Sequence, residues 1–268
     1  MLSEEAFNQQ LAEEANRIAA GRAAFRALAH GVEVVCDGVR SHLDTRELYR
    51  AYAAGLDSPE PIAELARTLV SQSAGIAEVI GHAGDYEFAR RHLYPQFVPE
   101  GMGPGRGVSR PWLPGLDITY VLDSDDWWQL VVVTEAMRRG WDVPEPRLFE
   151  VALENLAGAL AAPTCVVPGR AYAFAGGPRP HLNAVQILLR EQMEHLAFLC
   201  ESDTLHVVVP YRAYAAVFVP GEEEPERRAR RSLAPAAARH GYRVGDKTYA
   251  WRDGRWVGVV GEDAARED

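Results

Sequence analysis

Apolar and polar positions along the chain predict helices in the first third and pairs of strands after it. One short strand, Val32–Cys36, is expected among these helices, ahead of an Asp37-Gly38 turn. The start of one helix is marked by Ser58, with Pro59 at its first position. Helices are expected over residues 4–20, 44–54 and 59–73. Residues 1–97 are therefore predicted to form a mainly helical region.

Residues 98–115 are rich in proline and glycine, which favours a loop or linker. Beyond it, over 116–262, two strands followed by a helix recur three times, and the strands are joined by turns too short for parallel pairing. The strands are expected at 118–122, 127–133, 165–167, 171–174, 205–209, 213–219, 248–251 and 255–260, and the helices at 145–161, 181–200 and 224–240. The last hairpin turns at Asp253-Gly254, which suits a type I′ turn. The fold class predicted is α+β, with helices on an antiparallel sheet, in one integrated domain.

The strand over Trp127–Val133 is apolar on both of its faces, since side chains alternate with a period of two. An antiparallel sheet covered on one side would alternate apolar with polar, so both faces of this strand need cover. We expect the N-terminal helices to cover one face only partly. Trp112, Trp128 and Leu130 then form a predicted interaction surface for a protein partner or for a second copy of the chain.

Composition and charge narrow the classes of partner and the cellular location. A net charge of −10 disfavours nucleic-acid binding, because phosphates must be neutralised by basic residues. The acidic first residues do not resemble a signal peptide and no long apolar run is present, so a cytoplasmic protein that does not enter the membrane is expected. Lys247 is the only lysine among many arginines, which is typical of a GC-rich bacterial genome. Cys36, Cys165 and Cys200 share no metal-like spacing and are interpreted as buried thiols.

Two segments carry histidines and carboxylates at spacings that metal sites use. His82, Asp85 and His92 would share a face if their segment were a single helix, but Gly81 and Gly84 argue against one. Asp85 fits better as the N-cap of a helix over 86–93.

The second candidate is Glu191 with His195, four residues apart in a helix. The apolar stripe of that helix lies nearly opposite Glu191, which directs the carboxylate to water and favours a solvated pair. A metal site in either segment remains the less favoured of two interpretations.

No hydrolase, nucleotide-binding or dinucleotide-binding motif occurs, and no grouping of nucleophile and base is visible. The first hypothesis is therefore a non-catalytic regulatory or protein-interaction module without a cofactor. The alternative is a metal-dependent hydrolase that uses the 82–92 or the 191–195 segment. Catalytic residues cannot be named from the sequence.

Several segments resemble the YtpQ-like family of bacterial proteins, a domain of unknown function. The similarity runs from about residue 26 to 257, and the resemblance implies a cytoplasmic bacterial protein with no assigned activity, cofactor or catalytic residues. The segments that carry it are Tyr86-Glu-Phe-Ala-Arg-Arg-His-Leu-Tyr-Pro95, Ile118-Thr-Tyr-Val-Leu-Asp123, Leu148-Phe-Glu-Val-Ala-Leu-Glu-Asn-Leu156, Leu205-His-Val-Val-Val-Pro-Tyr-Arg212 and Tyr249-Ala-Trp-Arg-Asp-Gly-Arg-Trp256.

Overall fold

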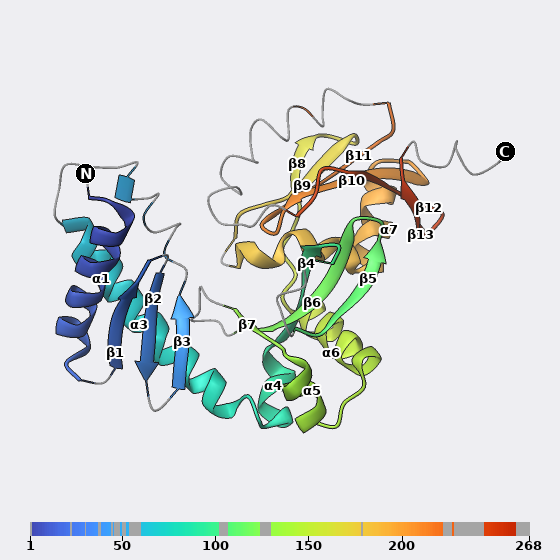
Figure 1. Cartoon of the computed structure of the whole chain (residues 1–268). Helices are drawn as coiled ribbons and strands as arrows, with labels where there is room; N and C mark the ends of the chain where they lie inside the picture. The colour runs from blue at the N-terminus through green and yellow to red at the C-terminus, as the bar shows by residue number, and fades with distance from the viewer. Residues whose placement is uncertain are drawn as a thin grey trace. The chain divides into compact units, whose positions relative to one another are not determined.

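A computed structural model gives the fold as a mixture of helices and antiparallel sheets, which confirms the α+β class (Figure 1). It describes residues 2–21, 23–29, 31–36, 39–43, 45, 49, 52–53, 60–101, 107–123, 130–177, 179–221, 227 and 244–260. The chain divides into two compact units, the first formed by 1–89 with 123–131 and the second by 90–122 with 132–268. Within the described residues, no helix combines the length and the apolar character needed to cross a membrane.

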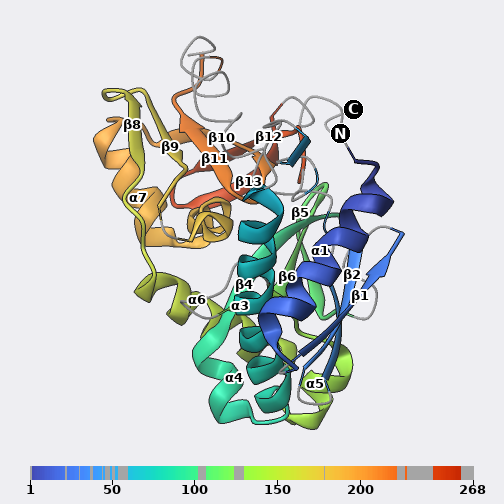
Figure 2. The same ribbon diagram turned by 90° about the vertical axis from the view of Figure 1, so that its left-hand side faces the viewer.

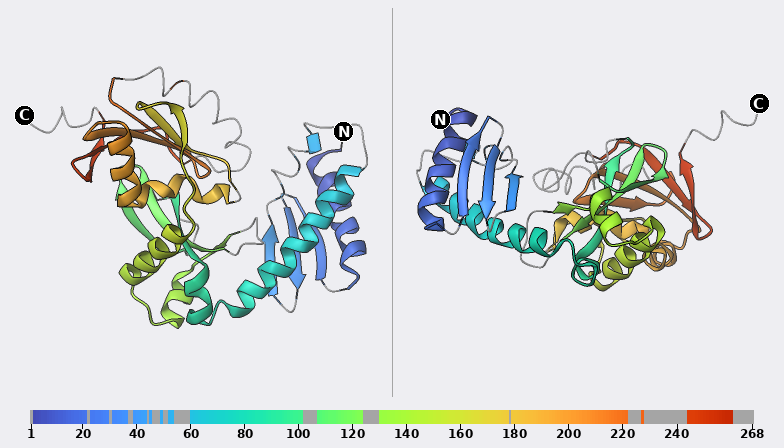
Figure 3. Two further views of the ribbon diagram at one scale, coloured as in Figure 1. Left: turned by 180° about the vertical axis from the view of Figure 1, so that it is seen from behind. Right: turned by 60° about the horizontal axis from the view of Figure 1, so that its bottom comes forward.

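The first unit is a three-stranded antiparallel sheet with two helices on one of its faces. Helix α1 (Glu4–Ala19) begins at Ser3, whose side chain accepts a hydrogen bond from the Ala6 backbone N–H. The strands follow in order, β1 (Ala23–Leu28), β2 (Gly31–Cys36) and β3 (Val39–Leu43), and helix α3 (Glu60–His82) lies beside α1 (Figure 3). The core between the helices and the sheet is built around Phe7, Leu11, Phe25, Val34 and Leu69.

The expectation of a single strand in this region was wrong, because β1 and β3 pair with β2 on its two edges. The β1 segment contains three alanines and an arginine, so it lacks the β-branched residues that mark a strand in sequence. Pairing with β2 and burial of Phe25 against α1 override that local preference. Helix α3 also continues through Gly81, beyond the predicted end at residue 73. Most of the helix expected over 44–54 lies outside the described residues.

The second unit contains a small sheet in which β6 (Leu116–Leu122) lies between β4 (Leu93–Pro99) and β5 (Ser109–Leu113). Strand β7 (Val131–Val132) also pairs with β6. The proline- and glycine-rich segment is therefore not a linker throughout, because both of its ends are strands and the Gly115 turn joins β5 to β6. Residues 102–106 of this segment lie outside the described residues. So do residues 124–129, which include Trp127 and Trp128 of the strand expected over 127–133.

A second sheet has six strands in the order β13-β12-β10-β11-β9-β8, all antiparallel. Strand pairs expected from the sequence are confirmed here. Asp253 and Gly254 have φ values of 50° and 77°, as a type I′ turn requires. The strands are β8 (Thr164–Val167), β9 (Ala171–Phe174), β10 (Thr204–Tyr211), β11 (Tyr214–Phe218), β12 (Thr248–Arg252) and β13 (Arg255–Val259).

Helices of the second unit differ from expectation in two places. The helix expected over 181–200 is interrupted at Leu189, whose ψ of 112° is extended. Before it lie two short 3₁₀ helices, η1 (Pro180–Leu182) and η2 (Ala184–Leu188), and after it lies α7 (Arg190–Leu199). Helix α5 (Glu135–Gly140) was not expected and begins at Thr134, which accepts a hydrogen bond from Met137 N–H. Helices α4 (Tyr86–His92) and α6 (Glu145–Gly158) match the prediction closely.

The repeated strand-strand-helix unit expected from the sequence is only partly visible. In the first repeat, the second strand is reduced to the two residues of β7 in the described part. In the third repeat, the helix expected over 224–240 lies outside the described residues apart from Arg227. The element that bears on function is α7, which follows the second pair of strands.

Candidate interaction surface

Helix α7 lies against the six-stranded sheet, and each of its ends meets a hairpin turn. At its start, a Cβ atom on Gly254 of the β12–β13 turn would lie 3.2 Å from Nη2 of Arg190. At its end, a Cβ atom on Gly169 of the β8–β9 turn would lie 3.8 Å from the Leu199 carbonyl oxygen. Figure 2 shows α7 beside β8 and β9. The two ends of α7 therefore lie close to the β12–β13 and β8–β9 turns.

The side of α7 that faces the sheet is apolar and buried. Met193 and Leu196 have no exposed surface, and Cys200 follows them at helical spacing just after the helix ends. Burial raises the pKa of the Cys200 thiol, which keeps this cysteine protonated at neutral pH. The prediction that this cysteine is buried is confirmed.

The opposite side of α7 carries an aromatic residue in solvent. Phe198 is 77% exposed, the largest value among the large apolar side chains described, and Leu199 beside it is 36% exposed. A helix that packs on a sheet normally presents polar residues on its outer side. Phe198 therefore has no packing role that its described surroundings explain.

Another exposed apolar residue precedes the edge strand β8, in a segment that is bonded to α7. Leu160, in the segment between α6 and β8, is 55% exposed, and the next residue, Ala161, accepts a hydrogen bond from Gln192 of α7 through its carbonyl oxygen (3.4 Å). Cys165 of β8 is exposed, which corrects the expectation that it is buried. It pairs with Tyr172 on β9, and a β-bulge follows it. We call Leu160, Phe198 and Leu199 the α7 patch.

The end of α7 departs from the usual chemistry of a helix terminus. Glu201 has a φ of 48°, in the left-handed region where glycine is usual after a helix. Its N–H donates to the Phe198 carbonyl oxygen (3.1 Å), and the Ser202 N–H donates to that of Ala197 (3.1 Å). A carboxylate here also lies at the negative end of the helix dipole. Both features are unfavourable for folding.

The residues predicted for a metal site have separate roles in the structure. Asp85 caps α4 by accepting from the Glu87 N–H (2.9 Å), while the His82 ring, at the exposed end of α3, lies 5.0 Å from the Phe88 ring. His92 is half-buried at the end of α4. Within the described part of the chain, no group of three or more histidine, cysteine or acidic side chains could hold a metal ion.

Glu191 and His195, the second pair predicted for a metal, are both exposed on α7, as the helical spacing indicated. Their neighbour Glu194 instead binds Arg190, with 2.7 Å between Oε1 and Nε. The Arg190–Glu194 ion pair lies on the solvent side of the helix and includes no buried group.

Of the residues predicted for an interaction surface, Trp112 is half-buried and packs within its own unit. Its ring stacks on Phe97 at 4.8 Å between centroids and meets the Trp256 ring edge-on at 5.0 Å. These contacts give Trp112 a structural role between β5 and β13. Leu130 is half-buried, and Trp128 lies outside the described residues.

Comparisons with known proteins give no relative. No protein-family model, no curated protein and no solved structure matches the chain. The functional argument therefore rests on the geometry of the chain itself.

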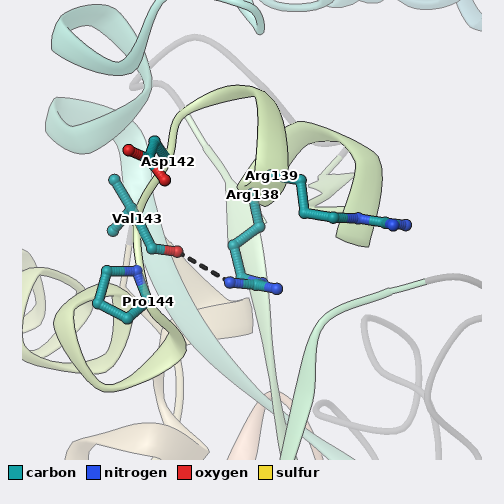
Figure 4. A pocket seen from close by; sticks show the side chains of 5 residues that line it. All are labelled: Arg138, Arg139, Asp142, Val143 and Pro144. Carbon is teal, nitrogen blue, oxygen red and sulfur yellow. Dashed lines mark hydrogen bonds between the residues drawn. The ribbon is translucent and has the colours of Figure 1, made fainter.

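A pocket of about 230 Å³ lies where α5 leads into α6 (Figure 4). Arg138 donates to the Val143 carbonyl oxygen at 3.1 Å, and its guanidinium also binds Glu135 at 2.9 Å, so its hydrogen bonds brace the turn. The side chain of Arg139 points away from Val143. The pocket is completed by Asp142 and Pro144. The Arg138 charge is thus engaged in holding the connection between two helices.

One buried hydroxyl in the second unit is linked to a carboxylate. Tyr120 on β6 has no exposed surface and donates a hydrogen bond to Oε1 of Glu145, the first residue of α6. Arg110 Nη1 lies 3.6 Å from the same oxygen. Burial, and secondly the bond to Glu145, raise the pKa of the Tyr120 hydroxyl. The Tyr120–Glu145 hydrogen bond therefore connects α6 to strand β6.

The α7 patch was missed by the sequence analysis, although a signal for it was present. The helical wheel that directs Glu191 to water also places Phe198 away from the apolar stripe. An apolar residue on the polar side of a helix is the signal that was overlooked.

Proposed function

We propose that this chain is a non-catalytic regulatory or protein-interaction module, and that the α7 patch is its contact surface. The observation that carries the proposal is the 77% exposure of Phe198 on a helix whose other side is fully packed. Aromatic side chains contribute much of the binding energy at protein interfaces. Exposed apolar residues that lie together mark such interfaces more often than single ones do.

The structure of the second unit favours binding of a partner through side chains over the addition of a strand to one of its sheets. Three edge strands of the second unit, β8, β13 and β5, carry a β-bulge where the register shifts, while the edge strand β4 is paired without a shift and contains Pro95 and Pro99. Strand β5 also contains Pro111, which has no backbone N–H. Bulges and prolines at an edge disfavour pairing with a further strand. A partner would therefore bind through the side chains of the α7 patch.

The resemblance to the YtpQ-like family is part of the same proposal. It rests on the motifs quoted from the sequence, and that family has no assigned activity. An interaction role agrees with it, as does the expected cytoplasmic location.

Photo-cross-linking in the cells that make the protein tests the proposal. A photoreactive amino acid replaces Leu160, and in a second strain it replaces Arg139, an exposed residue of α5. We expect one discrete adduct from position 160 and none from position 139. An adduct of two copies of the chain indicates self-association, and any other mass indicates a different partner.

The variant Phe198→Asp should remove the adduct, because it places a charge in the apolar contact. Val257→Asp is the matched control, since Val257 is another exposed apolar residue, 39% exposed, on β13. It should leave the adduct unchanged. The proposal fails if position 160 gives no more adduct than position 139 in folded protein, or if both variants act alike.

A further inference from the structure

We infer that Cys165 and Cys200 form a reversible disulfide when a hydroperoxide oxidises Cys165, which makes the pair a modification site at the end of α7. An exposed thiol on the edge strand β8 and a buried thiol just after α7 take part. The pair is independent of the proposed contact surface, since neither cysteine belongs to the α7 patch.

The register of the six-stranded sheet places Cys165 on the face that α7 covers. Cys165 is paired with Tyr172 of β9, and Tyr172 with Val217 of β11, so these three side chains share one face. Their neighbours along the strands, among them Ala173, point to the other face and form an apolar cluster there. Within the described residues, that cluster contains no side chain of α7, although the helix has buried apolar residues. The helix therefore packs on the face of Cys165.

Helix α7 runs beside β8, so that the end of the helix lies near the end of the strand (Figure 2). Near the start of α7, Gln192 donates a hydrogen bond to a carbonyl oxygen of the segment just before β8 (3.4 Å). At its end, the Leu199 carbonyl oxygen lies 3.8 Å from where a Cβ atom on Gly169, just after β8, would be. Cys200 follows Leu199 directly, and Cys165 lies on β8 between these two contacts.

The groups that act on the Cys200 thiol include Cys165. Burial is the main cause of the raised pKa of the Cys200 thiol, while Arg170 of the β8–β9 turn lowers this pKa and Cys165 raises it. Charged groups shift the pKa of a neighbour only over short distances. Arg170 and Cys165 therefore both lie close to the Cys200 thiol, in agreement with the strand register.

The two cysteines differ as a reacting and a resolving thiol do. Cys165 is exposed, so a dissolved oxidant can reach it. Cys200 is buried, and its raised pKa keeps it protonated, so it reacts slowly with a dissolved oxidant. Cysteines that respond to oxidants are commonly accessible and lie next to a second cysteine that resolves the first product. Cys165 is therefore oxidised first, and Cys200 reacts with the product.

The reaction balances with a hydroperoxide as the oxidant. The thiolate of Cys165 attacks the peroxide, so an S–O bond forms, the O–O bond breaks, and the departing oxygen leaves as water or an alcohol. The sulfur of Cys200 then attacks the sulfenic acid on Cys165, so the S–S bond forms, the S–O bond breaks, and the hydroxyl group leaves as water with the Cys200 proton. The two thiols are thus oxidised to a disulfide while the peroxide is reduced.

Strand β8 can adjust to bring the two sulfur atoms together. A disulfide holds its two Cα atoms about 4.4–6.8 Å apart. Among the described strands, β8 is at an edge and is paired on one side only, and its register shifts just after Cys165. A bulged edge strand is less constrained than a central strand, so β8 moves more readily than the packed helix does.

Peptide mapping of the full chain after treatment with hydrogen peroxide tests the disulfide. Trypsin cleaves after arginine, so it releases Cys165 in residues 148–170 and Cys200 in residues 191–212. We expect these two peptides to be joined when the folded protein is oxidised, and to separate on treatment with dithiothreitol. The oxidised protein should migrate as a single chain in a gel without reductant.

Three variants assign the roles of the cysteines. Cys165→Ser should abolish the joined peptides. Cys200→Ala should abolish them too, and should leave a sulfenic acid on Cys165 that dimedone captures. The unaltered protein should give little dimedone adduct, because Cys200 consumes the sulfenic acid. Cys36→Ser is the matched control, since it removes the third cysteine of the chain, and it should keep the joined peptides.

The disulfide is ruled out if the folded, unaltered protein gives sulfinic acid at Cys165 while Cys200 stays free, or if it gives a bond between the Cys165 residues of two copies. Loss of the joined peptides in Cys36→Ser would also overturn it. Mapping of the unaltered protein decides the question even if a variant does not fold. Cross-linking at position 160 has no bearing on this result, so the two proposals fail separately.

Discussion

Replacing Glu201 by glycine should stabilise the protein, although it removes a charged residue from the surface. The φ of 48° at Glu201 is strained for a residue with a Cβ atom, which costs about 1 kcal/mol or more. The carboxylate at the negative end of α7 adds about 0.5 kcal/mol. Glycine also increases the entropy of the unfolded chain, which lowers the free energy of unfolding by about 0.7 kcal/mol. The net expectation is a gain of about 1 kcal/mol.

Thermal unfolding followed by circular dichroism, together with urea unfolding, measures this gain. For a unit of this size, about 1 kcal/mol corresponds to a rise of about 3 °C in Tm. Glu201→Asn is the informative control, because asparagine tolerates the left-handed conformation and carries no charge. It should give roughly half of the effect. Asp142→Gly changes the corresponding residue after α5, where φ is 54°, and should also raise Tm, because it too removes a strained residue and a carboxylate at a helix end.

Glu201→Gly should therefore raise Tm. A fall in Tm, or no change, would refute the reasoning, because strain at Glu201 would then not oppose folding.

Four further outcomes are expected. Phe198→Asp should lower the free energy of unfolding by about 0.5 kcal/mol, the cost of a carboxylate in the last turn of α7, because the ring itself is mostly in solvent, and urea titration checks this. Tyr120→Phe should cost about 1–2 kcal/mol through the lost bond to a carboxylate. Because the pKa of the Tyr120 hydroxyl is raised in the folded protein, its contribution is complete below pH about 10, the pKa of the unfolded chain, and is lost progressively as the pH rises above that value, so above pH about 10 the variant should lose less stability than the unaltered protein. A thiol reagent should label Cys165 in the folded protein much faster than Cys200, because the Cys200 thiol is buried and its pKa is raised. Peptide mapping after labelling distinguishes the two cysteines, and equal rates would contradict the burial argument. Gly254→Ala should lower stability by about 1 kcal/mol, since φ is 77° there, and a Tm equal to that of the unaltered protein would show that the turn adapts.

Local sequence signals determined much of the second unit. Alternating apolar residues with short turns between them located the strands from Thr164 to Val259, and Asp253-Gly254 identified the last turn. Asp85 was recognised as the N-cap of α4 because capping depends on residues a few positions apart. Features of this kind are set by neighbours along the chain, so the sequence by itself was sufficient for them.

Elements whose stability depends on distant residues could not be recognised in this way. The alanine-rich β1 is a strand because β2 pairs with it and α1 buries Phe25, and neither contact is local. The prolines and glycines of segment 98–115 predict a loop or linker, yet both ends of the segment are strands because they pair with β6. Tertiary pairing outweighed local preference in both places.

The sequence could list chemically capable side chains, but only the tertiary structure decided which of them meet. It offered His82, Asp85 and His92 as ligands, whereas the fold uses Asp85 as a cap and places His82 beside Phe88. It offered Trp112 as a contact residue, and the fold packs that ring against Phe97 and Trp256. Exposure is a property of the packed chain, since it depends on which face of each element the rest of the protein covers. For that reason Phe198, an ordinary apolar residue in the sequence, became the candidate contact only when α7 was seen against its sheet.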